Sequence, residues 1–334
     1  MNKQADIAPA GFRHDADFTP PRGLGNAHVN TILGSLWPRK MLVRWRSRAL
    51  RRASRPVELT CRDNIRLLGE YSPHPNPKRG LAILIHGWEG SANSSYLLSA
   101  ATTLYQHGFS VFRLNLRDHG PSHHLNEEPF LAVRLEEVLD AAEQIQQHFP
   151  HEHFWLGGFS LGGNFAIRIA AHMQDHALRF TRVVAVCPPI DTGRSIESVS
   201  RSWFYNRYFS AKWRRSFMKK AALFPRHQSN THLMQSGNLM AMHKAFLPVY
   251  SKYPDTDSYF DAIRLNGAHI PRLGAPCTII ISKDDPVIPY PAHTDLPKLD
   301  NLTLMVTDRG GHCSFLKDYA LHSWVDEQFE KLFR

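Results

Sequence analysis

The chain has 334 residues, of which 43% are hydrophobic and 21% are charged, as is ordinary for a folded globular protein. This length suffices for one large α/β core or for two smaller domains, and the composition excludes a disordered or fibrous chain. Lys and Arg outnumber Asp and Glu by 40 to 30, an excess that favours contact with anionic surfaces without indicating a fold.

The N-terminal part of the chain, residues 1–56, is predicted to be an extension that packs on the core. Its first 30 residues lack the apolar run of a secretory signal, and no stretch of the sequence approaches the ~20 apolar residues of a membrane span. Residues 39–55 hold eight Lys or Arg and no acidic residue. Such a run could contact nucleic acid or acidic lipid, but we favour a solvated basic helix that covers one edge of the core.

From residue 57 onward, short apolar runs alternate with helical stretches. Residues 57–61 and 65–72 are predicted to form an antiparallel hairpin. Further apolar runs, some of them continuous as in strands buried on both faces, predict strands at 81–87, 110–116, 153–158, 182–187, 276–282 and 301–306. Helical patterns predict helices at 95–107, 129–149, 161–173 and 314–333. This alternation implies a mostly parallel central sheet with helices on both faces.

Almost ninety residues separate the strand predicted at 182–187 from the next one, which is too long for a simple crossover. The segment is rich in aromatic and cationic residues, as in RSWFYNRYFSAKWRRSF at 201–217. Because so long a connection is usually functional, we expect residues 188–270 to form a helical cap inserted into a core of residues 57–187 and 271–334. A helical decoration without a role at the site is the alternative.

Residues 158–162 read Gly-Phe-Ser-Leu-Gly and match the Gly-x-Ser-x-Gly pattern of a nucleophilic serine. The pattern alone is weak, since glycine and serine are common in loops. Here it lies between a predicted strand and a predicted helix. Ser160 is therefore expected at a sharp turn at the carboxyl end of the sheet, where α/β sheets bind ligands.

A serine nucleophile needs a base, and the base needs an acid that orients it. In hydrolases with this turn, the acid and then the histidine follow the serine along the chain. The loops after the last two predicted strands carry Asp284, Asp285 and His312, at the same edge of the sheet as Ser160. We predict His312 as the base and Asp285 as the acid, in preference to Asp284, although either Asp could instead cap the turn.

The oxyanion of such a reaction needs main-chain N–H donors, one after the nucleophile and one in the loop after an earlier strand. These are predicted to be Leu161 and Trp88, the latter in HGWEGS at 86–91. His86 is expected to pack and hydrogen-bond within that loop. The histidines of RDHGPSHH at 117–124 lack the spacing of metal ligands, so no metal is predicted. The four widely spaced cysteines form no Cys-x-x-Cys pair, which argues against zinc and disulfides and is typical of a reducing compartment.

Four segments together resemble the motif series of the YheT-like α/β-hydrolases, bacterial relatives of the eukaryotic abhydrolase-domain lipases: HGWEGSANSSY, GFSLGGN, ISKDDPVIP and GGHCSFL. The entry segment FTPPRGLGNAHVNTIL at 18–33 also resembles this group, although Asn30 stands where glutamine is usual. The resemblance spans about residues 18–330. It is specific as a set of motifs rather than through any one of them.

This resemblance implies the α/β-hydrolase fold, a triad of Ser160, Asp285 and His312, and esterase or lipase-like activity on acyl esters without a cofactor. The eukaryotic relatives carry a membrane anchor before the domain, and no such anchor is seen here. We therefore expect a soluble, cytoplasmic protein without a transmembrane segment.

The leading hypothesis is a serine hydrolase that cleaves small-molecule or lipid carboxylic esters through an acyl-enzyme. An acyltransferase with the same machinery is one alternative, and a non-catalytic binding protein that kept the fold is another. Specific nucleic-acid binding is not expected, because no recognition module accompanies the basic run. Peripheral contact of that run with an anionic membrane stays open.

Overall fold

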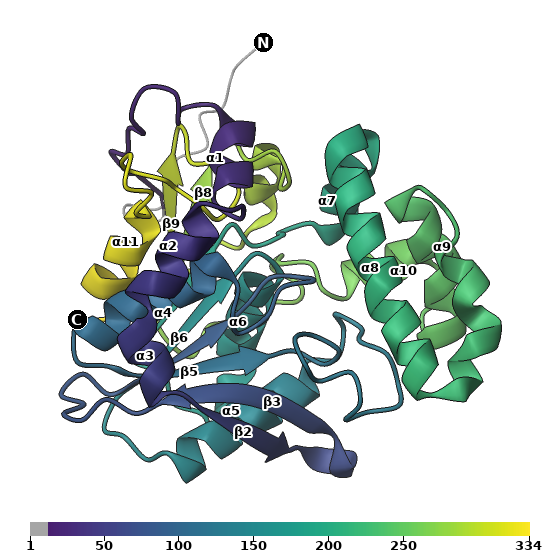
Figure 1. The fold of residues 1–334 in the computed structure, drawn as a ribbon, viewed down its shortest axis with the longest axis horizontal. Coiled ribbons are helices and arrows are strands. Elements are labelled where there is room, and N and C mark those ends of the chain that lie inside the picture. The colour runs from purple at the N-terminus through teal and green to yellow at the C-terminus, as the bar shows by residue number, and fades with distance from the viewer. Residues whose placement is uncertain (1–12) are drawn as a thin grey trace.

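The structure is a computed structural model that describes residues 13–334, so the first twelve residues of the predicted N-terminal extension lie outside the described residues. Strands in this part of the chain are β1 (Arg13–Asp15), β2 (Arg55–Thr60), β3 (Arg66–Ser72), β4 (Leu81–Ile85), β5 (Ser110–Asn115), β6 (Phe154–Phe159), β7 (Arg182–Val186), β8 (Cys277–Ser282) and β9 (Leu302–Thr307). They form one sheet in the order β1-β9-β8-β7-β6-β4-β5-β3-β2 (Figure 1). The first seven strands in this order, from β1 at the edge through β9, β8, β7, β6 and β4 to β5, are all parallel to their neighbours. Strand β3 is antiparallel to both β5 and β2.

The helices are α1 (Ala27–Leu33), α2 (Arg39–Arg46), α3 (Arg48–Ala53), α4 (Ser95–Gln106), α5 (Glu136–His148), α6 (Leu161–His172), α7 (Thr192–Arg201), α8 (Trp203–Leu223), α9 (Leu239–Tyr250), α10 (Thr256–Asp261) and α11 (Trp324–Leu332). Short 3₁₀ turns are η1 (Arg62–Asn64), η2 (Met173–Asp175), η3 (Pro225–Met234) and η4 (Tyr290–Asp295). The predicted fold class, an α/β hydrolase with a mostly parallel sheet, is confirmed.

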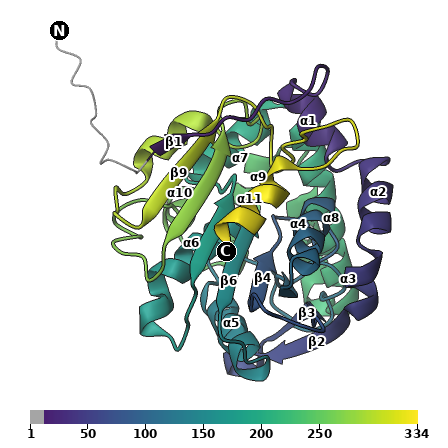
Figure 2. The ribbon, with the colours of Figure 1, turned by 90° about the vertical axis from the view of Figure 1, so that its left-hand side faces the viewer.

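The sheet is covered on both faces, which explains why its inner strands are continuous apolar runs. All five residues of β4 are buried, and they alternate between two apolar clusters. Leu81, Ile83 and Ile85 pack with α5 and α6, while Ala82 and Leu84 pack with α4 and α11. Figure 2 looks onto the face that α4 and α11 cover.

Two predicted helices begin later than their sequence pattern indicates. The helix predicted at 129–149 begins at Glu136, because the preceding main chain bonds to other elements. The N–H of Phe130 donates to Asp118 Oδ2 at 2.9 Å, and the N–H of Ala132 donates to the Tyr259 hydroxyl at 2.8 Å. Tertiary hydrogen bonds therefore replace the first helical turns.

The closing helix predicted at 314–333 is confined to Trp324–Leu332. The preceding residues fold back on themselves, since the N–H of Trp324 donates to the carbonyl of Phe315 at 2.8 Å. Phe315 and Leu321 have φ values of 42° and 61°, which no α-helix accommodates. The apolar residues of this loop resemble a helical pattern in the sequence because they are buried, although the loop itself is not helical.

Helices α7 to α10, together with η3, form a helical insertion between β7 and β8, within the segment predicted as a cap. Figure 1 shows them grouped to one side of the sheet layer. Helix α8 is held on the core by Lys220, whose Nζ lies 2.6 Å from Asp118 Oδ1 and also donates to the carbonyls of His123 and Asn126. Both charged side chains are buried, and burial raises the pKa of Asp118 to about 6 against the charge of Lys220.

We predict that Lys220→Met lowers the free energy of unfolding by about 3–5 kcal/mol, because it leaves the Asp118 carboxylate buried without its partner. The matched control is Lys219→Met, the same change at the exposed neighbouring residue, which should stay within about 0.5 kcal/mol of wild type. Urea unfolding followed by circular dichroism measures both. Equal stabilities of the two variants would contradict this account of how the insertion is anchored.

Candidate active site

Ser160 lies at the turn between β6 and α6, with φ 51° and ψ −123°. A positive φ is uncommon for a residue other than glycine and marks local strain that the surroundings must hold. Two glycines make the turn fit. A Cβ at Gly158 would lie 2.1 Å from the carbonyl oxygen of Gly162, and one at Gly162 would lie 2.3 Å from the carbonyl oxygen of Ile85. The Gly-x-Ser-x-Gly pattern thus has a steric cause.

His312 lies in the loop after β9, and its Nδ1 is 2.8 Å from Asp285 Oδ2. The other carboxylate oxygen of Asp285 accepts the N–H groups of Val287 at 2.8 Å and Ile288 at 2.9 Å, which fixes the carboxylate. Asp284 does not contact the imidazole. Its Oδ1 accepts the N–H of Gly311 at 3.0 Å and so holds the loop that carries His312.

The electrostatics of His312 are dominated by two opposing effects. Burial disfavours the imidazolium, but the charge of the Asp285 carboxylate and its hydrogen bond outweigh burial and raise the pKa of His312 above its ordinary value. In the neutral ring, a proton on Nδ1 directed at Asp285 leaves the Nε2 lone pair free to accept a proton, and Asp285 stabilises the imidazolium that then forms. His312 and Ser160 line the same groove.

The loop after β4 approaches Ser160 closely, since a Cβ at Gly87 would lie 2.9 Å from the Cβ of Ser160. On either side of Trp88 the N–H groups are occupied: that of Gly87 donates to the Tyr96 hydroxyl at 3.0 Å, and that of Glu89 to His119 Nε2 at 2.9 Å. The N–H of Trp88 donates to no described residue, nor does that of Leu161 in the first turn of α6. Both predicted donors are available to an incoming oxygen.

Two buried histidines support this loop. His86 Nε2 accepts the N–H of Leu116 at 3.1 Å, and burial lowers the pKa of His86 to about 4. His119, which the sequence placed only in a histidine-rich loop, accepts the N–H of Glu89 and is likewise held neutral, because burial lowers its pKa. Sequence reasoning missed the support that His119 gives, because nothing in RDHGPSHH indicates which atom it contacts.

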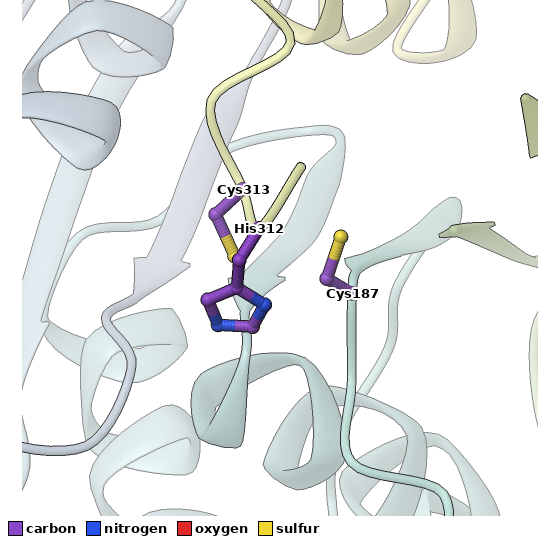
Figure 3. Close-up of side chains that lie close together, drawn as sticks. All are labelled: Cys187, His312 and Cys313. Atoms are coloured by element: carbon purple, nitrogen blue, oxygen red, sulfur yellow. The ribbon is translucent and has the colours of Figure 1, made fainter. Parts of the chain in front are cut away.

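Cys187 and Cys313 lie beside His312, with the three potential ligand atoms within 4.8 Å of one another (Figure 3). Burial raises the pKa of the Cys187 thiol, which favours a protonated thiol packed against the imidazole. The cysteines are distant in sequence, and only the sheet topology brings them together. A second group that could hold an ion, Asp140 with Glu143 and His176, lies elsewhere.

An apolar cavity and a larger groove meet at Ser160. The apolar cavity, of about 90 Å³, lies between the core and the helical insertion, and Leu161, Val199, Trp213 and Phe246 are among its lining residues. The groove, of about 780 Å³, runs between α8 and the α1–α2 region. Ser160 lines both, whereas His312 lines the groove alone.

Comparison with known proteins identifies the family of the chain. A family model described as "alpha/beta hydrolase fold" matches residues 82–319. The chain belongs to the α/β-hydrolase family. It is 23% identical to "Putative esterase YheT" of Escherichia coli, an alignment that covers 95% of this chain and 93% of that protein, and it is a YheT-like member.

Other relatives are also esterases and lipases by name. The chain is 22% identical to "Monoacylglycerol lipase" of Saccharomyces cerevisiae, over 79% of this chain and 62% of that protein. Its fold is similar to that of the Pyrococcus furiosus esterase Pf2001, with a TM-score of 0.52 and 18% identity, covering 94% of this chain and 97% of the other. The chain thus shares its fold and family with proteins that are named as esterases and lipases.

Because Asp284 and Asp285 make different contacts, their substitution is predicted to affect the pKa of His312 differently. In Asp285→Asn the pKa of His312 should fall, because the charge that stabilises the imidazolium is gone while burial still opposes it. Asp284→Asn should leave that pKa nearly unchanged. Titration of the His312 ring by NMR, in a Ser160→Ala background, measures both. A larger fall in Asp284→Asn would transfer the orienting role to Asp284.

Proposed function

We propose that the protein is a serine hydrolase that cleaves carboxylic esters with apolar acyl groups through an acyl-enzyme. The observation that carries the proposal is the convergence of three groups at one edge of the sheet: Ser160 on its strained turn, and His312 with its Nδ1 on Asp285. A strained turn that carries a serine, together with a histidine–carboxylate pair that lines the same groove, supports a nucleophile with its base.

In the proposed mechanism, Ser160 Oγ attacks the acyl carbonyl carbon while His312 Nε2 accepts the hydroxyl proton. Asp285 stabilises the imidazolium and keeps the ring oriented. The N–H groups of Trp88 and Leu161 donate to the oxyanion. Collapse expels the alcohol, which takes the proton from His312, and a water activated by His312 then releases the acid. Every step uses residues of this chain, so the proposal includes no metal or cofactor.

The acyl group is proposed to occupy the apolar cavity, because that cavity reaches Ser160 and Leu161 next to the oxyanion donors. Residues 188–270 then act as a cap that sets acyl selectivity. Among the aromatics of α8, Trp213 lines the cavity and Phe209 lines both the cavity and the groove, whereas Phe204, Tyr205 and Tyr208 line the groove. The alcohol part of the ester would lie in the groove, where water can also enter for the second step.

Ser160→Ala is predicted to lower kcat for a p-nitrophenyl ester by about 10⁴-fold or more, while the unfolding curve stays that of a folded protein. Removing the hydroxyl removes the nucleophile but leaves the turn and both oxyanion donors in place. Steady-state kinetics on the purified variant measure the loss. Activity close to wild type would eliminate Ser160 as the nucleophile.

Filling the cavity should shorten the preferred acyl chain. Val199 is buried and lines the cavity, so Val199→Trp is predicted to lower kcat/KM for long-chain p-nitrophenyl esters by about tenfold or more relative to short-chain ones. Val249→Trp makes the same change at an exposed site on α9 and should keep the wild-type profile. If both variants keep it while remaining folded, the acyl group binds elsewhere.

A further inference from the structure

Two basic segments form the walls of the groove that holds Ser160 and His312. Residues 18–57 contain nine Lys or Arg and residues 198–254 contain ten, and neither segment contains an Asp or Glu. The first segment supplies α1 and α2, and the second supplies α8, so that these helices lie on either side of the groove (Figure 1). Of the cations in these two segments, Lys40, Lys212, Arg215 and Lys219 line the groove itself.

Large apolar side chains stand exposed along the same walls. Trp37, Met41 and Trp45 are 72%, 55% and 60% exposed. Met41 and Trp45 are four residues apart and so lie on one side of α2, while Trp37 lies in the turn just before this helix. The opposite side of α2 carries the buried Val43, so the helix has a packed face and an unpacked apolar face. Across the groove, Trp203 at the start of α8 is 77% exposed. Three largely exposed tryptophans are unusual on the surface of a soluble protein.

These residues are continuous with the groove lining. Leu36 and Lys40 line it from the α2 side, next to Trp37 and Met41. Phe204 lines it from α8, next to Trp203. We call the exposed apolar and basic residues at the two groove edges the rim: Leu36, Trp37, Lys40, Met41, Arg44, Trp45, Trp203, Phe204, Arg207 and Tyr208.

The charges of the rim are not neutralised within the molecule. Lys40, Arg44 and Arg207 are exposed, and among the described residues none of them has a carboxylate within ion-pair distance. By contrast Arg226, at the far end of the insertion, pairs with Glu127 and Glu128. The rim thus presents cations and tryptophans together, without acidic residues.

We propose that the rim docks on the surface of an anionic lipid bilayer, so that the groove opens toward the membrane and esters reach Ser160 from the lipid. Tryptophan is favoured at the level of the lipid headgroups, and Lys or Arg near an anionic leaflet is attracted to it. A nucleic-acid duplex would satisfy the cations but offers no apolar layer to the exposed indoles. The delivery of substrate rests on the proposed function, whereas the docking itself does not.

Docking of this kind is peripheral. None of the helices within residues 13–334 is both long and apolar enough to cross a bilayer. An amphiphilic ester entering from the rim would pass between the walls and place its acyl chain in the apolar cavity. Its polar part would stay in the groove near Lys212 and Arg215, which line it.

The first test is flotation of the full chain with vesicles of phosphatidylcholine, with or without about one third phosphatidylglycerol. We expect binding to the phosphatidylglycerol vesicles, at least about tenfold weaker binding to phosphatidylcholine alone, and loss of binding in about 1 M salt. Failure to bind the anionic vesicles, or equal binding to both kinds, would overturn the proposal.

Paired substitutions locate the surface. The double variant with Trp37→Ser and Trp203→Ser, called the tryptophan variant, should bind vesicles at least about tenfold more weakly than wild type. Leu223→Ser with Val249→Ser is the matched control, because these residues are about half exposed, with 49% and 51%, and do not line the groove. Leu223 also lies twenty residues along α8 from Trp203, about 30 Å away. Unchanged binding of the tryptophan variant, or equal loss in the control, would overturn the assignment to the rim.

The charges are tested in the same way. Arg44→Glu with Arg207→Glu should abolish the preference for phosphatidylglycerol, whereas Lys244→Glu with Lys331→Glu, at exposed sites that do not line the groove, should leave it within about twofold. A short DNA duplex that displaces the protein, combined with full vesicle binding by the tryptophan variant, would instead assign the surface to phosphate binding and overturn membrane docking.

A separate readout distinguishes this proposal from the proposed function. Ser160→Ala should float with anionic vesicles as wild type does, and the tryptophan variant should hydrolyse a water-soluble short-chain ester at the wild-type rate. Hydrolysis without flotation would refute docking alone. Flotation without any hydrolysis by the wild type would refute the esterase proposal alone.

Discussion

The position of Ser160 depends on how closely the turn between β6 and α6 approaches its own helix and the neighbouring strand β4. A Cβ at Gly158 or Gly162 would come within 2.1 and 2.3 Å of main-chain oxygens, so only glycine allows this approach. At this turn Ser160 has a positive φ of 51°, and the N–H groups in the first turn of α6 have no partner within the helix. The position of Ser160 and the strain of its turn thus accompany one steric constraint.

A parallel sheet then brings the other groups to this turn. The loops that follow β4, β6, β8 and β9 all leave the sheet at its carboxyl edge, and they carry Trp88, Ser160, Asp285 and His312. The two adjacent aspartates make different contacts. Asp285 faces the imidazole, while Asp284 holds the main chain at Gly311, so that neither could replace the other without moving His312.

Much of this arrangement could be predicted from the sequence, because its strands are continuous apolar runs and the glycines around Ser160 have a local steric meaning. Element boundaries that depend on distant contacts could not. Residues 129–135 have a helical pattern, yet the N–H of Phe130 bonds to Asp118 and that of Ala132 bonds to Tyr259, 127 residues later in the chain. The packing of Cys187 beside His312 likewise results from topology and leaves no local signal.

The basic run at 39–55 shows a second limit of sequence reasoning. Counting charges indicates a solvated helix, and α2 and α3 do have exposed arginines over the buried Val43 and Leu50. The charge count does not reveal that Trp45 of this segment and Trp37 just before it are exposed, near a groove whose other wall is a basic helix that begins at Trp203.

The central claim is that Ser160 is a nucleophile activated by His312, and covalent labelling tests it most directly. Incubation with a fluorophosphonate, followed by intact-protein and peptide mass spectrometry, should show one adduct per chain on the peptide that contains Ser160. The adduct should be absent in Ser160→Ala and should form far more slowly in His312→Ala. An unlabelled wild-type protein, or an adduct on any other residue, would contradict the account.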